Sequence, residues 1–418
     1  MYLSELELQT VRQEFPVFAQ QNPTVFLDNA GGSQVLGRVA QRISNYLLTS
    51  SVQLGASYST SQQASERVLQ ARSAVAELIN AKDDREVVMG GSTTGLMFLL
   101  IQAILPSIQA GDEIIITNTD HEANIGAWKR LQAAGAIIKV WEVNRDNLQL
   151  ELPQLQQLLN SRTKWVAMTH ASNVLGTINP VDEVASLVHA VGARLCVDGV
   201  AYAPHRLVDV QASGADIYVF SFYKVFGPHY AVLWGHYDFL CTLAGLNHFF
   251  IGAEDLPYKL QPGNVNFELS YGCAGIRDYL IAMGESFGGK GSERELMQYA
   301  FDRFEAHENA LAEQLLSFLR NRPLVKIIGL SAIEQNQASQ QIRRVPTISF
   351  VVEGRNSASI VRHIDQYGIG IRFGDFYAKH LIQTLDLEKH GGVVRVSIAH
   401  YNSKQEINRL IQHLSEII

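Results

Sequence analysis

The sequence predicts an α/β fold, with a large domain whose mostly parallel sheet carries helices on both faces, followed by a smaller α+β C-terminal domain. Two observations lead to this prediction. Short apolar runs alternate with amphipathic helical segments over most of the chain, and strands that are apolar throughout are typical of a sheet buried on both faces. The rhythm changes after about residue 270, where a Gly-rich stretch at 284–291 precedes a long amphipathic helix.

The length of the chain agrees with more than one domain. Its 418 residues exceed what a single hydrophobic core fills and suit two or three domains. We expect an N-terminal arm at 1–18 that packs on the small domain, a large domain at 19–275 and the small domain at 276–418.

The expected elements alternate regularly along the large domain. Its strands are expected at 86–89, 113–117, 137–143, 165–169, 195–198 and 217–221. Its helices are expected at 64–79, 94–105, 125–134, 152–159 and 181–191. The small domain is expected to hold helices at 293–321, 357–367 and 404–417, and strands at 347–352 and 393–398.

Composition and charge exclude several classes of protein. The 34 Lys and Arg against 41 Asp and Glu give a net charge of −7 without a dense basic run, so we expect neither a nucleic-acid nor a membrane partner. The most apolar stretch, 96–105, is too short to cross a bilayer, and residues 1–14 have the pattern of an acidic amphipathic helix, not of a signal peptide. The three cysteines, Cys196, Cys241 and Cys273, lack metal-ligand spacing, so we predict no metal site. They are also too few to indicate a disulfide framework, so we predict a cytoplasmic location.

The candidate functional residues follow the expected strands, where open α/β sheets bind their ligands. The first segment, Gly-Gly-Ser-Thr-Thr-Gly at 90–95, joins a strand to an apolar helix. Its small residues allow a phosphate to approach the backbone, and the helix start offers free N–H groups with hydroxyls from Ser92 and Thr93. It lacks the lysine of a P-loop, and ordinary helix capping explains Ser and Thr there equally well.

Two further segments offer one polar side chain each. His121, in Thr-Asp-His-Glu-Ala-Asn at 119–124, is placed to stack on a flat aromatic cofactor, although a capped surface turn is the simpler explanation. Asn173, in the segment 169–176, offers an amide that can donate to a cofactor hydroxyl, and its alternative is an ordinary turn asparagine.

Asp198 and Lys224 end two apolar strands. A carboxylate there is unfavourable unless paired, and beside a pyridine nitrogen Asp198 would keep that nitrogen protonated; a helix cap or a structural ion pair is the alternative. Lys224 stands among aromatic residues in Ser-Phe-Tyr-Lys-Val-Phe-Gly-Pro at 221–228, where lost hydration favours the neutral amine that forms Schiff bases. A surface lysine that extends to solvent is its alternative.

In this order the segments resemble the class V aminotransferases, and most closely their cysteine desulfurase-like branch. The resemblance rests on Phe-Leu-Asp-Asn-Ala-Gly-Gly at 26–32, Gly-Ser-Thr-Thr-Gly, Asp-His-Glu-Ala-Asn, Ser-Asn-Val-Leu-Gly at 172–176, Val-Asp-Gly at 197–199 and Ser-Phe-Tyr-Lys, and it covers residues 20–400. It implies a fold type I enzyme with pyridoxal 5'-phosphate (PLP), a transferase or lyase acting on a small amino acid, and a homodimer.

The resemblance also implies roles for particular residues. Lys224 would hold PLP as an aldimine, Asp198 would pair with the ring nitrogen and His121 would stack on the ring, which makes these three the catalytic residues. The phosphate would be held by Ser92, Thr93, Ser221 and Tyr223, with Asn264 reaching it from the neighbouring subunit. Asn173, Arg395 and Arg372 would bind the substrate, with an arginine on its carboxylate.

Departures from the family pattern bear on the reaction. Tyr377 stands at about the position of the nucleophilic cysteine of desulfurases, Ala201 replaces a usual Gln, and Tyr223 replaces a frequent His. Because persulfide formation needs a thiolate, we rank aminotransferase or C–S lyase activity above true cysteine desulfuration. A non-catalytic protein of the same fold is a further alternative, and a nucleotide-binding oxidoreductase lacks its Gly-rich fingerprint here.

Overall fold

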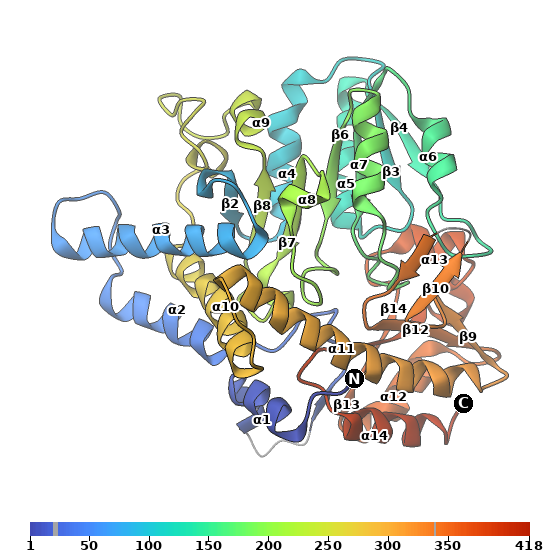
Figure 1. Ribbon diagram of the computed structural model, residues 1–418. Coiled ribbons are helices and arrows are strands. Elements are labelled where there is room, and N and C mark those ends of the chain that lie inside the picture. The colour runs from blue at the N-terminus through green and yellow to red at the C-terminus, as the bar shows by residue number, and fades with distance from the viewer. Residues whose placement is uncertain (20–23, 338–339) are drawn as a thin grey trace.

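The computed structural model describes residues 1–19, 24–337 and 340–418, and its centre is a seven-stranded sheet (Figure 1). The strands lie in the order β2, β8, β7, β6, β5, β3, β4. β8 is antiparallel to both neighbours, and the other pairs are parallel. The bounds are β2 Val87–Gly90, β3 Glu113–Thr117, β4 Ile137–Trp141, β5 Thr163–Thr169, β6 Arg194–Asp198, β7 Ile217–Ser221 and β8 Ala231–Gly235.

Helices cover both faces of this sheet, as the apolar strands predict. Ile115 of β3 belongs to one hydrophobic cluster, while its neighbours Ile114 and Ile116 belong to another, because successive side chains of a strand point to opposite faces. The first cluster includes α7 (Val181–Ala190), and the second includes α4 (Thr93–Ile104) and α5 (Glu122–Lys129). The α/β fold class with a mostly parallel sheet is therefore confirmed.

A second, four-stranded antiparallel sheet lies in the C-terminal part. Its order is β14 (Arg372–Gly374), β15 (Val393–Ser397), β12 (Thr347–Val352) and β9 (Val325–Ile328). It shares a hydrophobic core with three helices: α11 (Glu293–Arg320), α12 (Ser357–Asp365) and α14 (Lys404–Leu414).

The remaining helices and strands are α1 Glu5–Gln13, α2 Gly37–Thr49, α3 Ser59–Ile79, α6 Leu152–Leu158, α8 Val210–Ser213, α9 Tyr237–Thr242, α10 Phe267–Ser286, α13 Lys379–Thr384, β1 Val25–Phe26, β10 Glu334–Gln337, β11 Gln340–Arg343 and β13 Ile369–Gly370.

Three features connect the expected units of the chain. β1 pairs in parallel with β13, and α10 runs across 275–276, where the sequence analysis placed the domain boundary. Near the N-terminus, Glu7 pairs with Arg303 of α11 at 2.6 Å, and Figure 1 shows α1 at the lower edge of the molecule. We keep the division into 1–18, 19–275 and 276–418 as a proposal, with α10 shared by the last two units.

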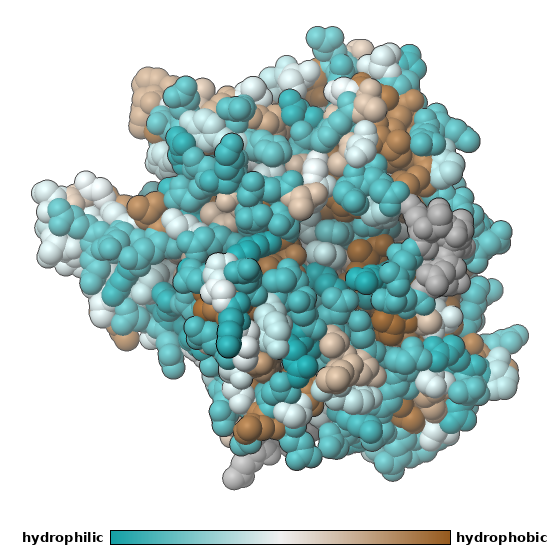
Figure 2. All heavy atoms as spheres, in the orientation of Figure 1, coloured by the Kyte–Doolittle hydropathy of each residue, from teal (hydrophilic) through white to brown (hydrophobic). Residues whose placement is uncertain are grey.

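The outer surface offers few clues to function. Figure 2 shows mostly hydrophilic residues on the face in view, with hydrophobic ones in scattered groups. Among residues 1–19, 24–337 and 340–418, no helix has the length and apolar character needed to cross a membrane. The same described ranges hold no cluster of three or more His, Cys, Asp or Glu arranged to bind a metal ion.

Candidate active site

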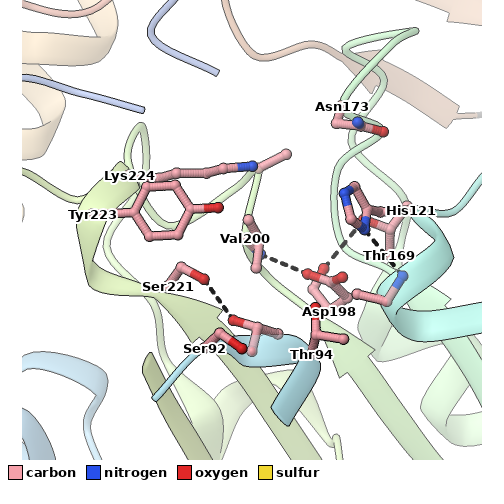
Figure 3. A pocket seen from close by; sticks show the side chains of 13 residues that line it. Ser92, Thr94, His121, Thr169, Asn173, Asp198, Val200, Ser221, Tyr223 and Lys224 are labelled. Atoms are coloured by element: carbon pink, nitrogen blue, oxygen red, sulfur yellow. Dashed lines mark hydrogen bonds between the residues drawn. The ribbon is translucent and has the colours of Figure 1, made fainter. Parts of the chain in front are cut away.

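The carboxyl ends of neighbouring parallel strands β5, β6 and β7 bring several candidate residues to one cavity (Figure 3). Eight of the expected site residues line it: Ser92, Thr93, His121, Asn173, Asp198, Ser221, Tyr223 and Lys224. Thr94, Ala123, Thr169, Val200 and Ala201 complete the lining.

Lys224 lies in the short 3-10 turn that follows β7. Only 8% of the residue is exposed. Burial, assisted by the charge of Arg395, lowers the pKa of the Lys224 amine to about 8, while Asp198 and Asp28 act in the opposite direction. A substantial fraction of this amine is therefore neutral near physiological pH, which is the form that attacks a carbonyl carbon.

Asp198 ends β6 and is 4% exposed. Burial raises the pKa of its carboxyl, and the backbone N–H of Val200 donates to Oδ1 at 2.9 Å. Within the described part of the chain this carboxylate has no ion-pair partner, so a ligand that brings a positive charge would stabilise it. The next residue must be small, because a Cβ at Gly199 would collide with the ring of Tyr218.

His121 caps the N-terminus of α5 and lies on the side of the pocket opposite Lys224 (Figure 3). Its Nδ1 accepts the backbone N–H of Ala123 at 3.0 Å, which places the ring proton on Nε2. Burial, with the charges of Lys224 and Arg395, lowers the pKa of His121 to about 4. The ring is therefore neutral at physiological pH and suits packing against a flat aromatic group.

The start of α4 supplies hydroxyl groups and free N–H groups at the bottom of the pocket (Figure 3). Thr93 Oγ1 and Ser221 Oγ lie 2.6 Å apart. Ser92 accepts the N–H of Gly95 at 3.1 Å and has a φ of 89°, a conformation that non-glycine residues rarely adopt. A helix N-terminus of this kind favours an anionic group such as phosphate.

Asn173 lies above His121 in Figure 3 and connects the pocket to the small domain. Its Nδ2 donates to the carbonyl oxygen of Phe376 at 2.9 Å. The following residue, Tyr377, is 72% exposed, and its ring centroid lies 5.2 Å from that of His121. The loop that carries Tyr377 therefore lies beside two residues of the cavity lining, and we call it the rim loop.

Three expected site residues do not line the cavity of this chain. Asn264 is exposed and donates to the side chain of Gln53 at 3.4 Å. Arg372 and Arg395 both pair with the carboxylate of Asp28, at 2.8 and 3.1 Å. Their expected roles toward substrate and phosphate therefore stay predictions.

Two acidic residues near the site received no role in the sequence analysis. Asp28 belongs to the motif at 26–32, but only the fold brings it to arginines more than 300 positions away. Asp120 is 1% exposed and accepts from Thr117 at 2.5 Å and from Asn124 at 2.7 Å. Burial raises its pKa to about 7. The sequence could have indicated Asp120, because it stands directly before His121. The residues around Asp28 in the sequence give no indication of its contacts with the two arginines.

Known proteins resemble this chain over nearly its whole length. The family model for class V aminotransferases matches residues 25–410. An aminotransferase-like protein of Gibberella zeae is 40% identical over 426 residues, which cover 100% of both chains. A cysteine desulfurase-like protein of Aspergillus flavus is 32% identical over 424 residues, covering 99% of this chain and 91% of that relative. The crystal structure of a cysteine desulfurase of Escherichia coli has a TM-score of 0.82 at 24% identity, covers 98% of each chain and shows the shared fold.

Proposed function

This chain belongs to the class V aminotransferase family and is a PLP-dependent enzyme, and from this premise we propose that Lys224 carries the cofactor and that the substrate is a small amino acid. One observation carries the proposal: a buried amine and a buried carboxylate without an ion-pair partner line the same cavity. That combination suits a ligand with both an aldehyde and a basic ring nitrogen.

The residues present fit the aldehyde, the ring nitrogen and the phosphate of PLP. Asp198 would face the pyridine nitrogen, because this buried carboxylate lacks a cationic partner in the described chain. The phosphate would be held at the start of α4 by four side chains: Thr93, Ser221, Ser92 and Tyr223. When bound, PLP supplies an electron-withdrawing ring that takes up the electron pair released at the substrate α-carbon.

The protein's own groups would handle the protons. Because the pKa of Lys224 is lowered to about 8, its Nζ can accept a proton from the substrate α-carbon and return it near neutral pH. The neutral ring of His121 would orient the cofactor by packing. Asn173, bonded to the backbone of Phe376, would fix the rim loop relative to the substrate.

We propose transamination or C–S bond cleavage as the reaction, in preference to persulfide-forming desulfuration. By the family resemblance, Tyr377 stands at about the position of the nucleophilic cysteine of desulfurases, and a phenol does not form a persulfide. Cys196 and Cys273 are buried, and burial raises the pKa of both thiols well above the usual range. Cys241 lies on α9, outside the cavity lining.

Two experiments test these proposals. The purified protein should show the absorption band of bound PLP, and Lys224→Ala should remove it while the fold is retained. A colourless protein that does not take up added PLP would refute the proposed role of Lys224. An amino-acid panel assayed separately for keto acid, pyruvate and sulfide should give keto acid or pyruvate; release of sulfide with a protein-bound persulfide would instead support true desulfuration.

We also propose a homodimer, in which Asn264 contacts the phosphate of the neighbouring subunit. Asn264 is exposed and lies outside the cavity lining of its own chain, and Phe249 and Phe250 before it are 99% and 67% exposed. Exposed aromatic pairs of this kind favour burial against another chain. Light scattering that gives the mass of a monomer would contradict the dimer.

The three cysteines favour a reducing compartment, so we propose that the protein is cytoplasmic, which cell fractionation would check.

A further inference from the structure

Asp28 holds both arginines that were expected to bind the substrate. Its Oδ2 accepts from Arg372 Nε at 2.8 Å, and its Oδ1 accepts from Arg395 Nη2 at 3.1 Å. The Arg395 side chain is 2% exposed, that of Asp28 is 21% exposed and that of Arg372 is 59% exposed. A single carboxylate thus bridges one buried and one exposed guanidinium group.

The strand register explains why a carboxylate is needed there. Arg372 of β14 and Arg395 of β15 are directly opposite each other in an antiparallel pair. Like charges in that arrangement repel each other, and a carboxylate between them offsets the repulsion through charge-assisted hydrogen bonds. The site then keeps a net charge of about +1 from two cations and one anion.

The remaining surface of Arg395 is largely occupied. Its Nη1 donates to the carbonyl oxygen of Asn173 at 3.2 Å, and the ring of Phe376 covers its face with a distance of 3.8 Å from Cζ to the ring centroid. Its Nε is buried without a hydrogen-bond partner in the described structure. Asn173 lines the cavity, whereas neither arginine does, and Asp28 and Phe376 together cover the Arg395 guanidinium group beside Asn173.

We propose that Asp28 is a specificity-determining residue: an internal carboxylate that caps the Arg372–Arg395 pair and has to be displaced by the carboxylate of the substrate. This inference rests on the proposed function, in which the amine of the substrate is held at the Lys224 end of the cavity. A substrate held by its amine presents its carboxylate at a high effective concentration, enough to compete with Asp28. A simple carboxylate without an amine lacks this advantage, so the cap selects amino acids against other organic acids.

Propionate, which has a carboxylate and no amine, is the probe for this cap. Its dissociation constant is measured on the cofactor-free protein from the rise in melting temperature with propionate concentration, and on the PLP-loaded protein from the change in the PLP absorption band. Asp28→Asn should tighten propionate binding by roughly threefold to tenfold, because the competing charge is gone and the net charge of the site rises. Asp28→Glu keeps the charge and should stay within about twofold of the unaltered protein.

Matched controls separate a cap from a general charge effect. Glu14→Gln removes a carboxylate paired with Arg38 at 2.7 Å outside the cavity lining and should leave propionate binding unchanged. Propionamide, which carries no charge, should bind no better to Asp28→Asn. Where Asp28→Asn fails to fold, Arg372→Gln on an exposed side chain replaces it and should weaken propionate binding.

Unchanged or weaker propionate binding in a folded Asp28→Asn protein would overturn the proposal and make Asp28 a residue that only positions the arginines. Equal tightening in Glu14→Gln, or unaltered binding in Arg372→Gln, would overturn it as well. Because the cofactor-free measurement does not depend on PLP, failure of the cap remains distinguishable from failure of the proposed enzyme.

Discussion

The floor and the rim of the cavity differ in how they are held and therefore in what they control. On the floor, Asp198 ends β6 and Lys224 follows the adjacent strand β7, and the two residues are 4% and 8% exposed. On the rim, Tyr377 belongs to the loop between β14 and α13 and is 72% exposed. The buried surroundings of Asp198 and Lys224 set the pKa values of these groups. The exposed side chain of Tyr377, in contrast, can be replaced by another residue type without disturbing its neighbours.

The rim loop is fixed through its backbone. Asn173 donates to the carbonyl oxygen of Phe376 at 2.9 Å, and the N–H of Glu122 donates to the carbonyl oxygen of Tyr377 at 2.7 Å. Phe376 and Tyr377 have φ angles of 54° and 58°, which turns both carbonyls toward the large domain's residues. These contacts do not involve the side chain of residue 377. A different side chain at this position could therefore alter the reaction while the loop keeps its conformation.

The largest effect is expected on the floor, from Lys224→Arg. Arginine keeps the positive charge but stays protonated, so it neither forms a Schiff base nor exchanges a proton at neutral pH. We expect turnover to fall by roughly a thousandfold or more, measured with the best substrate from the amino-acid panel. A circular dichroism spectrum and melting temperature like those of the unaltered protein serve as the control. Activity within tenfold of the original would remove Lys224 from the chemistry.

A second floor variant, Asp198→Asn, tests the role of the buried charge. The amide keeps an acceptor for the N–H of Val200 but no longer stabilises a protonated ring nitrogen, so kcat should fall by about a hundredfold. The control is Asp216→Asn, which loses ion pairs with His189 and Arg194 at 2.9 and 3.0 Å. That variant should lower the melting temperature and leave kcat within about twofold. Equal losses of kcat in both would show that Asp198 acts only through stability.

The pH dependence of PLP uptake tests the lowered pKa of Lys224 on the floor of the cavity. Burial lowers the pKa of Lys224 from 10.5 to about 8, so the neutral fraction of the amine rises with pH and levels off above that value. Below about pH 8 the rate of PLP attachment to the cofactor-free protein should rise by roughly tenfold per pH unit. Stopped-flow absorbance from about pH 6 to about pH 9 gives this rate. A rate that still climbs with the same slope at the upper end would indicate an amine with an ordinary pKa.

The smallest effect is expected at the rim, from Tyr377→Phe. The phenol ring is 72% exposed, and the backbone carbonyl makes the contact with α5, so kcat and KM should each stay within about twofold. Steady-state kinetics on the same substrate measures both. A fall in kcat of the size expected for Asp198→Asn would make the hydroxyl of Tyr377 a catalytic acid or base and would erase the contrast between floor and rim.

Much of the large domain was accessible from the sequence. The strands 113–117 and 217–221 were predicted with the bounds that the structure has. Both are apolar throughout because the sheet is buried on both faces. Helix ends were less accurate: the helix expected at 125–134 begins at Glu122 and changes to a 3-10 helix after Lys129, because the side chain of His121 caps it earlier. Strand β8 was missed, since the short run Ala231–Gly235 shows no periodicity that favours a strand over another buried segment.

Sequence alone determined which chemical groups follow the strands, because strand ends and small-residue helix starts are local features of composition and order. It thereby placed Lys224, Asp198 and the hydroxyls of α4 at one edge of the sheet. Only the tertiary structure decided what surrounds them. Asp28 of the large domain meets Arg395 of the small domain across 367 positions, and Phe376, from the loop after β14, covers that arginine. Such contacts follow from the packing of distant elements, which leaves no spacing in the sequence to recognise.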